Sequence, residues 1–348
     1  MAPHLRLLRA DIANPAPPQY SLRAESCLDD VVALMATVTV GGRLDRLGVI
    51  AQEHLSTGGK RMRARLSLAA AAALGAERSS AVPWAAAIEL LHNATLIHDD
   101  IQDGDLLRRG QPTVWVRHGV AQAINAGDLM LMLPFLALDH LDAADDGVRW
   151  RLSRALARHA AATVRGQSEE LALLTAGQLG RARYRRAVEG KTGSLFALPV
   201  EGAALLGGRS AADAQALGDR FTALGVLFQL QDDVVDLYGD KGRGHRGSDL
   251  EEGKVSALVL AHLDRAPEDR EWLLELLAAP RDVTGVEAVE EAIERFRKSG
   301  ALEDVLDEIR EIGQKLSSDT LLQSEPELAH VADEVRHLAL KPIRHLLT

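Results

Sequence analysis

Two short acidic stretches have the residue types and the spacing that metal chemistry needs. The first contains Asp99, Asp100 and Asp103, and the same Asp-Asp-x-x-Asp spacing returns from Asp232 to Asp236. Each residue of an α-helix turns the chain by about 100°, so residues four apart lie within about 40° of each other. Each stretch therefore offers two carboxylates on one helix face, and carboxylate oxygens are good ligands for Mg²⁺.

Basic residues stand close to these acids in the sequence. Arg108 and Arg109 follow the first stretch, and residues 239–247, with four glycines and four basic residues, follow the second. Acids can hold a hard cation, the cation can hold a phosphate, and arginines can bind the remaining phosphate oxygens. We therefore expect a phosphate-bearing substrate to bind through Mg²⁺ between the two stretches.

Simpler interpretations of these charges remain open. A single Asp-Asp-x-x-Asp can be a solvated helix end, a Lys/Arg run such as residues 60–65 can be a solvated face, and Arg108 can pair with Asp105 nearby. His98 beside Asp99 could belong to a metal-dependent phosphohydrolase, although further histidines at ligand spacing are not apparent. The repeated acidic spacing favours a functional site, because none of these alternatives explains both stretches.

The acids are expected near the ends of two long helices. Ser80 and Pro83 predict a helix start that leads to about Asp103, and Ser210 with Asp213 resembles an N-cap box for a helix to about Tyr238. The other predicted helices are 22–55 with a break at 41–42, 60–74, 119–140, 144–175 with a later junction at 190–193, and four or five amphipathic helices after residue 254.

The composition agrees with an all-α protein. Of 348 residues, 47% are hydrophobic, 26% are charged and only 3% are aromatic, which is the balance of packed amphipathic helices. The formal net charge of −10, without long basic blocks, argues against nucleic acid as a partner. A single cysteine, Cys27, permits no intrachain disulfide, so we expect a reducing, cytoplasmic location.

The chain ends and the apolar segments give further expectations. Residues 1–20 contain four prolines and no apolar core of signal-peptide length, so we expect an irregular lead-in before a single domain over 21–348. Charged residues or glycines interrupt the apolar segments every few residues. We therefore expect no transmembrane segment and a soluble protein.

The motifs together resemble those of the trans-isoprenyl diphosphate synthase, or polyprenyl synthetase, family. Both acidic stretches match its aspartate-rich motifs, and the remaining matches follow the family's order, so that all of them together span residues 58 to 254. The matching segments are Gly58-Gly59-Lys60-Arg61-Met62-Arg63, His98 to Asp103 with Arg108-Arg109-Gly110, Lys191-Thr192, Phe228 to Asp236, and Gly247 to Lys254.

This resemblance implies an all-α barrel of helices around a deep central cavity, in a protein that is usually a homodimer. It also implies two diphosphate substrates. The isopentenyl diphosphate would bind at Lys60, Arg63, His92 and Arg109, and the allylic diphosphate at Arg108, Lys191, Thr192, Gln229 and Lys254, with Gly59 as a further substrate-binding residue. Without the resemblance, His92 would be read as an ordinary helix histidine.

The resemblance implies metal and catalytic roles as well. Asp99, Asp103 and Asp232 would be the main Mg²⁺ ligands, and the other three acids would bind metal, its water or neighbouring basic groups. The implied metal set is Asp99, Asp100, Asp103, Asp232 and Asp236, with Asp233 beside it, and the implied catalytic set is Asp99, Asp100, Asp103, Lys191, Asp232 and Lys254.

The implied reaction joins an allylic diphosphate head-to-tail, in trans, to isopentenyl diphosphate. Cleavage of the allylic carbon–oxygen bond leaves an anionic diphosphate, which Mg²⁺ and cationic side chains stabilise. The isopentenyl double bond then attacks the carbocation, and a proton is lost. Two alternatives remain: a terpene cyclase, whose usual second metal motif is absent, and a non-catalytic subunit, which should have lost acids that this chain retains.

In this family, residues just before the first acidic motif help to set the length of the product. Here Ala94 and Thr95 are small, which favours geranylgeranyl diphosphate or a longer product. Helix geometry puts Ala94 about 140° from Asp99, whereas Leu91 shares the face of Asp99, so the role of Ala94 rests on the resemblance.

Three positions depart from the family pattern. Ala64 stands where proline is usual, and Glu170 stands where aspartate is frequent. The loop before Gly247 is one residue out of register, so that either Arg243 or Arg246 could replace the usual lysine.

Overall fold

The computed structural model describes residues 20–22, 27–42, 45–141, 146–174, 179–239, 246–280 and 284–347. Most of the expected lead-in, and Arg243 in the glycine-rich loop, lie outside these ranges. The described residues are almost entirely helical, and their one hairpin has strands of two residues each. The prediction of an all-α fold is therefore confirmed, and the assignment of residues 21–348 to one domain stays a prediction.

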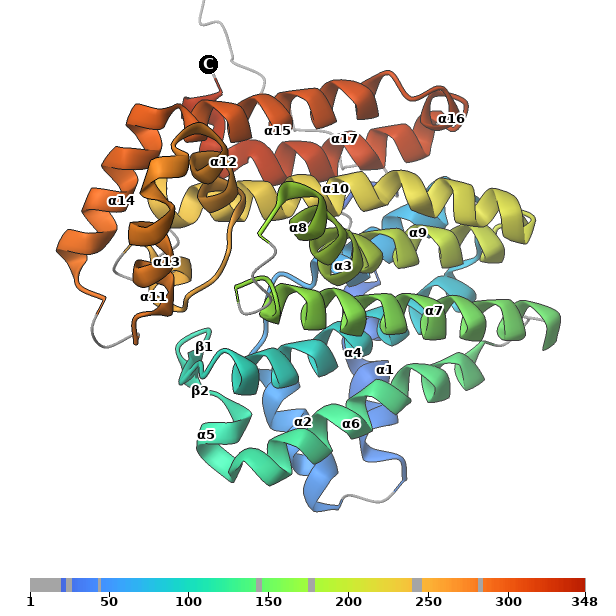
Figure 1. Ribbon diagram of the computed structural model, residues 1–348. Coiled ribbons are helices and arrows are strands. Elements are labelled where there is room, and N and C mark those ends of the chain that lie inside the picture. The colour runs from blue at the N-terminus through green and yellow to red at the C-terminus, as the bar shows by residue number, and fades with distance from the viewer. Residues whose placement is uncertain are drawn as a thin grey trace, which may run out of the picture.

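The N-terminal part of the chain supplies one wall of the molecule and the first acidic stretch. The long helix α4 is its centre, and Figure 1 shows α6 packed alongside it. The elements are α1 (Leu28–Val40), α2 (Arg46–Ser56), α3 (Met62–Ala73), α4 (Arg78–Gln102), β1 (Leu107–Arg108), β2 (Gln111–Pro112), α5 (Val114–His118), α6 (Val120–Ala137) and the 3₁₀ turn η1 (Leu138–His140).

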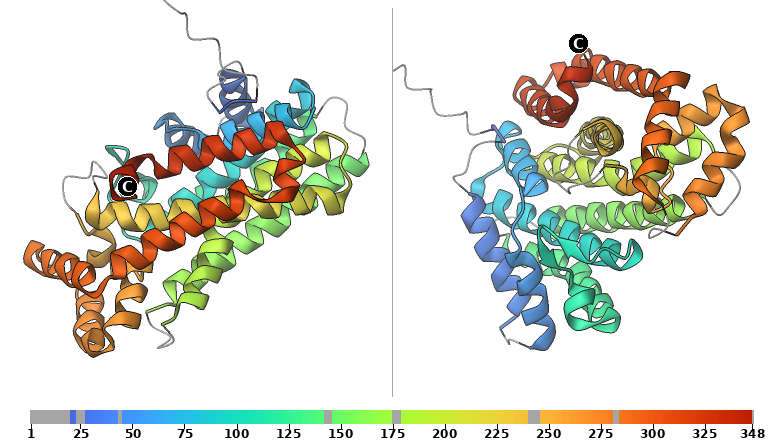
Figure 2. Two further views of the ribbon diagram at one scale, coloured as in Figure 1. Left: turned by 90° about the horizontal axis from the view of Figure 1, so that it is seen from above. Right: turned by 90° about the vertical axis from the view of Figure 1, so that its left-hand side faces the viewer.

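The middle part brings the second acidic stretch into the centre of the molecule. Figure 2 shows α10 end-on in its right-hand view, with the N-terminal helices on one side and the C-terminal helices on the other. The elements are α7 (Asp146–Leu171), α8 (Arg181–Val188), the π-helical turn η2 (Glu189–Gly193), α9 (Ser194–Leu206) and α10 (Ala211–Tyr238).

The C-terminal part packs against α10 from the other side. It contains six α-helices after Lys254 in the described ranges, of which α16 has a single turn, where four or five were expected. The elements are α11 (Ser248–Glu251), α12 (Ala257–Arg265), η3 (Pro267–Asp269), α13 (Arg270–Ala278), α14 (Val286–Ser299), α15 (Ala301–Ser317), α16 (Thr320–Gln323), α17 (Pro326–Leu340) and η4 (Lys341–Leu346).

The predicted helix starts are partly correct. Ser210 caps α10 as expected, because its Oγ accepts a hydrogen bond from the Asp213 amide at 3.2 Å. The start of α4 is earlier than predicted, at Arg78, and Pro83 lies inside the helix. Pro83 lacks the N–H that would bond to the carbonyl four residues upstream, and that carbonyl belongs to the first turn of α4. The proline therefore disturbs α4 less than it would in the middle of the helix.

Close backbone packing explains the junction near residue 190. It is a π-helical turn, η2, rather than a break, and it joins α8 to α9. A Cβ atom on Gly166 of α7 would overlap the backbone of Gly190 and Lys191, so glycine lets α7 approach this turn. Single π turns inside helices often occur at functional sites, and this one carries Lys191 and Thr192.

Buried apolar side chains form two clusters that meet along α10. The first joins α1–α7 with α9 and α17, and the second joins the C-terminal half of α10 with α12–α15. Phe228 on α10 packs against both clusters. The second acidic stretch therefore stands on a helix that is held from both sides.

One helix of the fold is more apolar than the sequence analysis expected. The segment Val120–His140, which contains α6 and η1, is long and apolar enough to span a membrane by length and composition. A few polar residues such as Asp128 interrupt this segment but lower its mean hydropathy only slightly. In the fold, α6 packs one side against α4, and 39% of its most apolar window is buried.

Candidate active site

The two acidic stretches face one cavity from different helices. Asp99 and Asp103 lie at the C-terminal end of α4, and Asp232 lies near the C-terminal end of α10. The cavity has a volume of about 350 Å³ and is lined mainly by charged and polar side chains. We call it the acidic cavity. The fold thus brings together carboxylates that lie far apart in the sequence.

Positive side chains balance these acids. Lys254 Nζ donates to Asp103 Oδ2 at 2.9 Å and also pairs with Glu252 at 2.8 Å. Burial works against the charge of Lys254, but Asp103 and Glu252 raise its pKa above the ordinary value. Lys254 therefore stays protonated and bridges the segment after α11 to the C-terminal end of α4.

Lys191 occupies the opposite side of the cavity. Its Nζ donates to Glu170 of α7, the residue that stands where the family often has aspartate. Burial lowers the pKa of Lys191, but Glu170 and Asp99 outweigh burial and raise it overall. The lysine is thus charged beside Asp99, where a leaving diphosphate would need a cation.

Asp99 has an unusual pKa for a carboxyl group. Burial raises it from 3.8 to about 6, the nearby Lys191 lowers it in part, and Asp103 and Glu170 raise it further. Because burial disfavours the charged carboxylate, a cation that approaches Asp99 stabilises it. Asp99 is therefore suited to hold a divalent ion together with Asp103.

Asp100 has a different environment from its neighbour Asp99. It is buried, and its Oδ1 accepts from Arg108 Nε at 2.5 Å. It does not line the acidic cavity, whereas Arg108 does. Asp100 therefore holds the guanidinium of Arg108 in place without lining the cavity itself.

The second acidic stretch divides in the same way. Asp232 lines the acidic cavity, whereas Asp236 accepts from Ser248 Oγ at 2.7 Å and from the Asp249 amide at 3.1 Å. Asp236 thus ties the end of α10 to the start of α11.

Asp233 is held by three donors. They are Tyr184 Oη at 2.6 Å, Gln229 Nε2 at 2.9 Å and the Ala257 amide at 2.7 Å. Burial raises its pKa to about 6 against the effect of these donors. Asp233 therefore joins α8, α10 and α12 and fixes Gln229, which also accepts from Thr192 at 3.2 Å.

The two adjacent arginines have different partners, because Arg108 lies in β1 and Arg109 lies in the turn that follows. Arg109 and Gly110 form the two-residue turn between β1 and β2, and both have positive φ, of 54° and 75°. Arg108 points to the acidic cavity, whereas Arg109 donates from Nη1 to the Gly58 carbonyl. A Cβ atom on Gly59 would lie 2.5 Å from the Arg109 guanidinium carbon, so Gly59 leaves the space that Arg109 fills.

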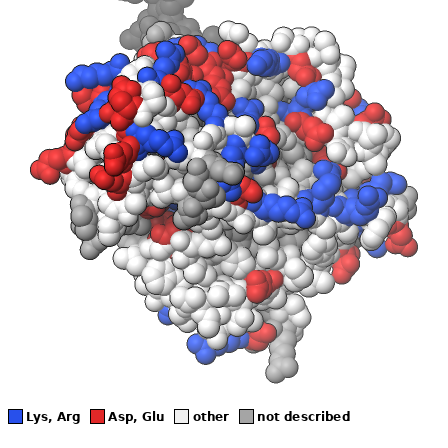
Figure 3. All heavy atoms as spheres, viewed as in Figure 1, with Lys and Arg blue, Asp and Glu red and all other residues white. Residues whose placement is uncertain are grey.

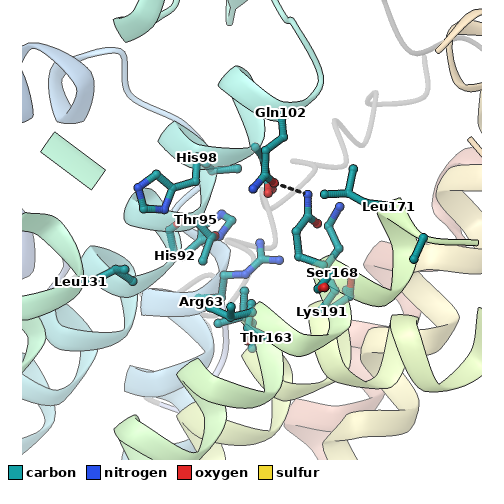
Figure 4. A pocket seen from close by; sticks show the side chains of 17 residues that line it. Arg63, His92, Thr95, His98, Gln102, Leu131, Thr163, Ser168, Leu171 and Lys191 are labelled. Carbon is teal, nitrogen blue, oxygen red and sulfur yellow. Dashed lines mark hydrogen bonds between the residues drawn. The ribbon is translucent and has the colours of Figure 1, made fainter. Parts of the chain in front are cut away.

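A second, larger cavity of about 540 Å³ adjoins the acidic cavity. Figure 4 shows Arg63 and Lys191 reaching into it from different helices. Arg63, Leu96, Asp99, Lys191 and Thr192 line both cavities. We call this second space the tail cavity, because its far part is lined by the apolar side chains Leu131, Val164, Leu171, Ala172 and Leu195.

Thr95 lines the tail cavity, as the chain-length prediction requires. Ala94 and Leu91 are instead fully buried in the first apolar cluster and do not line it. A wider side chain at position 95 would therefore enter the cavity, whereas one at position 94 would enter the core.

Two basic groups at the mouth of the tail cavity are incompletely paired. Buried Nε of Arg63 and Nδ1 of His92 have no hydrogen-bond partner among the described residues. Burial, and then the charge of Arg63, hold the pKa of His92 well below its usual value, so His92 is neutral. Lys60 is exposed on the loop before α3, and it lines neither cavity, as is also true of Gly59 and Arg109.

No group of three or more Asp, Glu, His or Cys side chains in the described ranges is arranged to hold a metal by itself. Asp99 and Asp103 on one wall and Asp232 on the other supply the hard oxygen donors that Mg²⁺ needs, but each wall leaves most of the coordination open. The donor set fits an ion that also binds substrate oxygens.

Comparison with known proteins identifies this arrangement. The sequence profile of the polyprenyl synthetase family matches residues 45–296, which is well over half of the chain. The chain belongs to the polyprenyl synthetase family. The family predicted from the motifs is thereby confirmed, and so is the prediction of a prenyl-transferring enzyme.

Individual members of the polyprenyl synthetase family agree with this assignment. A short chain isoprenyl diphosphate synthase of Methanothermobacter thermautotrophicus is 35% identical over 82% of this chain and 88% of its own. A geranylgeranyl diphosphate synthase of Mycobacterium tuberculosis is 37% identical over 65% of each chain. A crystal structure of a Caulobacter crescentus polyprenyl synthase, complexed with calcium and isoprenyl diphosphate, has 28% identity and a TM-score of 0.77, covering 91% of this chain and 95% of that one.

Some residues of this polyprenyl synthetase site were not expected from the sequence. Tyr184 is buried and holds Asp233, and Gln102 accepts from Gln167 Nε2 at 2.8 Å across the tail cavity (Figure 4). Leu131 and Thr163 come from α6 and α7, which carry no family motif at these positions. Their spacing carries no chemical signal, because only the packing of the helices brings them to the cavity.

Because the pKa of Asp99 is raised, replacing it by a neutral residue should increase the free energy of unfolding by an amount that depends on pH. The folded state favours protonated Asp99 over the charged form. The stability that the protonated form contributes is therefore present below about pH 4 and is lost as the pH rises through about 6. Asp99→Asn should therefore unfold with a free energy about 2–3 kcal/mol higher than the unchanged protein at pH 8, and with no difference at pH 4. Urea denaturation in EDTA measures both values.

The exposed Asp139 of η1 provides the control for this experiment. Asp139→Asn should change the unfolding free energy by less than about 0.5 kcal/mol at either pH. An Asp99→Asn variant that is less stable than the unchanged protein at pH 8 would contradict the assigned burial cost.

Proposed function

We propose that this chain is a Mg²⁺-dependent prenyl diphosphate synthase that condenses an allylic diphosphate with isopentenyl diphosphate, head-to-tail and in trans. The observation that carries the proposal is the pair of carboxylate walls, Asp99 with Asp103 and Asp232, around one cavity that opens into an apolar space. The two cavities match the two ends of a prenyl diphosphate. Its diphosphate suits the acidic cavity through cations, and its hydrocarbon suits the tail cavity.

Asp99, Asp103 and Asp232 are the residues that would hold Mg²⁺. When bound, the ions would neutralise the diphosphate and stabilise the charge that it gains as a leaving group. Lys191, Arg108 and Lys254 add positive charge around the same oxygens. Asp100 and Asp236 are proposed as positioning residues, because their oxygens accept from Arg108 and Ser248 respectively.

The second substrate is proposed to bind at the mouth of the tail cavity. Arg109 donates to Gly58 in the loop that also carries Lys60 and leads to Arg63, and the unpaired Nε of Arg63 and Nδ1 of His92 are available to an anion. This position brings the isopentenyl double bond toward the carbon that loses its diphosphate beside Lys191.

The carbocation chemistry needs no protein nucleophile. The single cysteine, Cys27, precedes α1 and is absent from the lining of both cavities. The departing diphosphate is itself a base near the new bond, and we propose that it takes the proton that the condensation releases. The protein's part is to hold two anions together and to separate the cation from water.

Turnover with defined substrates tests this function. The purified protein, incubated with isopentenyl diphosphate, farnesyl diphosphate and Mg²⁺, should give elongated prenyl diphosphates that chromatography resolves. The Asp99→Ala Asp232→Ala double variant should lose about a thousandfold or more of this activity, because charge stabilisation in the transition state is removed. Asp139→Ala is the matched control and should retain the activity.

Absence of an elongated product with any of geranyl, farnesyl or geranylgeranyl diphosphate as primer would refute the proposal. Equal activity of the double variant and the unchanged protein would refute the role of the acids.

The product is proposed to be geranylgeranyl diphosphate or longer. The tail cavity has small Thr95 beside the diphosphate region, and its volume of about 540 Å³ gives room for further isoprene units. Relatives named as geranylgeranyl diphosphate synthases support this range.

A phenylalanine at position 95 should shorten the product. The ring of Thr95→Phe would enter the tail cavity and block chain growth, so the main product should move to a shorter chain while turnover continues. Ala94→Phe is the comparison: position 94 is buried in the core, so it should lower thermal stability more than it shortens the product. An unchanged product distribution for Thr95→Phe would refute this assignment.

We also propose a homodimer that forms through α6 and α7. Figure 3 shows that the lower part of this face is largely without charge, and α6 crosses it in the same view in Figure 1. The exposed apolar side chains on these two helices are Val120, Ile124, Met132 and Leu136 of α6 and Trp150, Val164 and Leu171 of α7. Exposed apolar side chains gathered on two neighbouring helices favour association in water.

Charge placed on this surface should dissociate the dimer. Met132→Glu with Leu136→Glu should convert a sedimentation species of about 75 kDa, twice the 37.5 kDa chain, into the monomer. Leu338→Glu, at an exposed position of α17, is the control and should leave the dimer intact. A monomer for the unchanged protein at micromolar concentration would refute the proposal.

We propose a cytoplasmic location from the cysteine content of the chain. The sequence has one cysteine and cannot form an intrachain disulfide, which suits a reducing compartment.

A further inference from the structure

Arg61 belongs to the basic motif but points away from both cavities. Only 8% of its surface is exposed, and its Nη2 donates to the Leu55 carbonyl at 2.6 Å, near the end of α2. Its Nη1 lies 3.5 Å from Glu89 Oε1. Arg61 is therefore a buried link between α2 and α4, and it does not line either proposed substrate pocket.

The backbone of Arg61 is itself unusual. It has φ of 48° and ψ of 40°, in the left-handed region that side chains other than glycine, asparagine and aspartate rarely adopt. Such a conformation persists where surrounding contacts hold it. The two bonds of the guanidinium, to α2 and to α4, are those contacts.

Glu89 holds the other end of this link. It lies on α4 with 2% of its surface exposed, and its Oε2 accepts from the Ala64 amide at 3.1 Å. Ala64 is in the first turn of α3, a helix that has no side-chain cap and no acid in that turn. Glu89 therefore caps α3 from a neighbouring helix and offsets the basic residues at its start.

The departure from the family pattern at position 64 fits this role. The family usually has proline there, and proline has no N–H to donate. In this chain the Ala64 amide donates to Glu89, which also accepts from Arg61 and Asn93.

The loop that these two residues hold carries the groups proposed to bind isopentenyl diphosphate. Lys60 precedes Arg61, Arg63 follows it, and Arg109 donates to the carbonyl of Gly58. A shift of this loop would therefore move three cations at once.

We propose that the buried Arg61–Glu89 pair is a positioning unit that sets the basic loop 58–63 and the start of α3 for the diphosphate of the second substrate. The proposal rests on the proposed function for its substrate. Neither residue touches the substrate; both act through Lys60, Arg63 and Arg109.

Glu89→Gln tests this role, because glutamine keeps the size of glutamate and loses its charge. The KM for isopentenyl diphosphate should rise about tenfold or more, since a displacement near 1 Å can cost about a hundredfold. The KM for the allylic diphosphate and kcat at saturation should change less than the KM for isopentenyl diphosphate, because only Arg63 of these three cations lines the acidic cavity.

Glu201→Gln is the matched control. Glu201 is also buried and pairs with Arg158 and His159, but it joins α7 to α9 away from the basic loop. A general loss of stability would act alike in both variants. A tenfold higher KM in Glu89→Gln but not in Glu201→Gln supports positioning, and equal KM values in the two variants overturn it.

A second set of variants covers the case in which Glu89→Gln folds poorly. The Arg61→Gln Glu89→Gln double variant leaves no unpaired buried charge, so it should fold better than either single variant. It should still show the raised KM for isopentenyl diphosphate, because both links are lost. A double variant with the KM of the unchanged protein overturns the proposal.

Binding of inorganic pyrophosphate separates this inference from the proposed reaction. Calorimetry without turnover should give weaker binding at the basic loop for Glu89→Gln than for Glu201→Gln, even if prenyl transfer fails. Equal pyrophosphate binding in both variants overturns the positioning role.

Discussion

Charge pairing inside a helical cavity is the constraint on which the site depends. A buried charge without a partner is costly, so the ions that bind diphosphate must be held by other ions before substrate arrives. Lys254 is held by Asp103, Lys191 by Glu170 and Arg108 by Asp100. Each cation thus has a fixed position before any anion enters the cavity.

The same constraint divides the acids into two kinds. Asp99, Asp103 and Asp232 line the acidic cavity, whereas Asp100 and Asp236 accept hydrogen bonds outside its lining. Asp233 does both, because it lines the cavity and accepts from Tyr184. The Asp-Asp-x-x-Asp spacing therefore serves two purposes at once. One acid reaches the cavity, and its neighbour, about 100° away around the helix, fixes the surrounding structure.

The acidic cavity and the tail cavity have opposite chemical character but share a wall. Asp99 and Lys191 belong to both, so a diphosphate in one and a hydrocarbon in the other would meet beside them. Burial of Asp99 disfavours its charged form, so a neutral residue there would give a more stable fold but would lack the charge that the proposed cation needs.

Much of this protein follows from local sequence. The two acidic stretches, the basic motif at Gly58 to Arg63 and the Ser210 cap each depend on neighbours within a few residues, and so the helices and the family were predictable and the site residues could be proposed. The start of α4 and the membrane-like character of α6 were less so, because a proline early in a helix and scattered polar residues are weak local signals.

The tertiary structure decided what depends on distant residues. It turned Asp100 toward Arg108 and Arg61 toward Glu89, sent Arg109 to Gly58, and put Thr95 rather than Ala94 on the tail cavity. Residue types and spacing determined which groups could do the chemistry. Which of them line the two cavities depends on how helices far apart in the sequence pack together, because a side chain's partner across a helix interface leaves no trace in its local sequence.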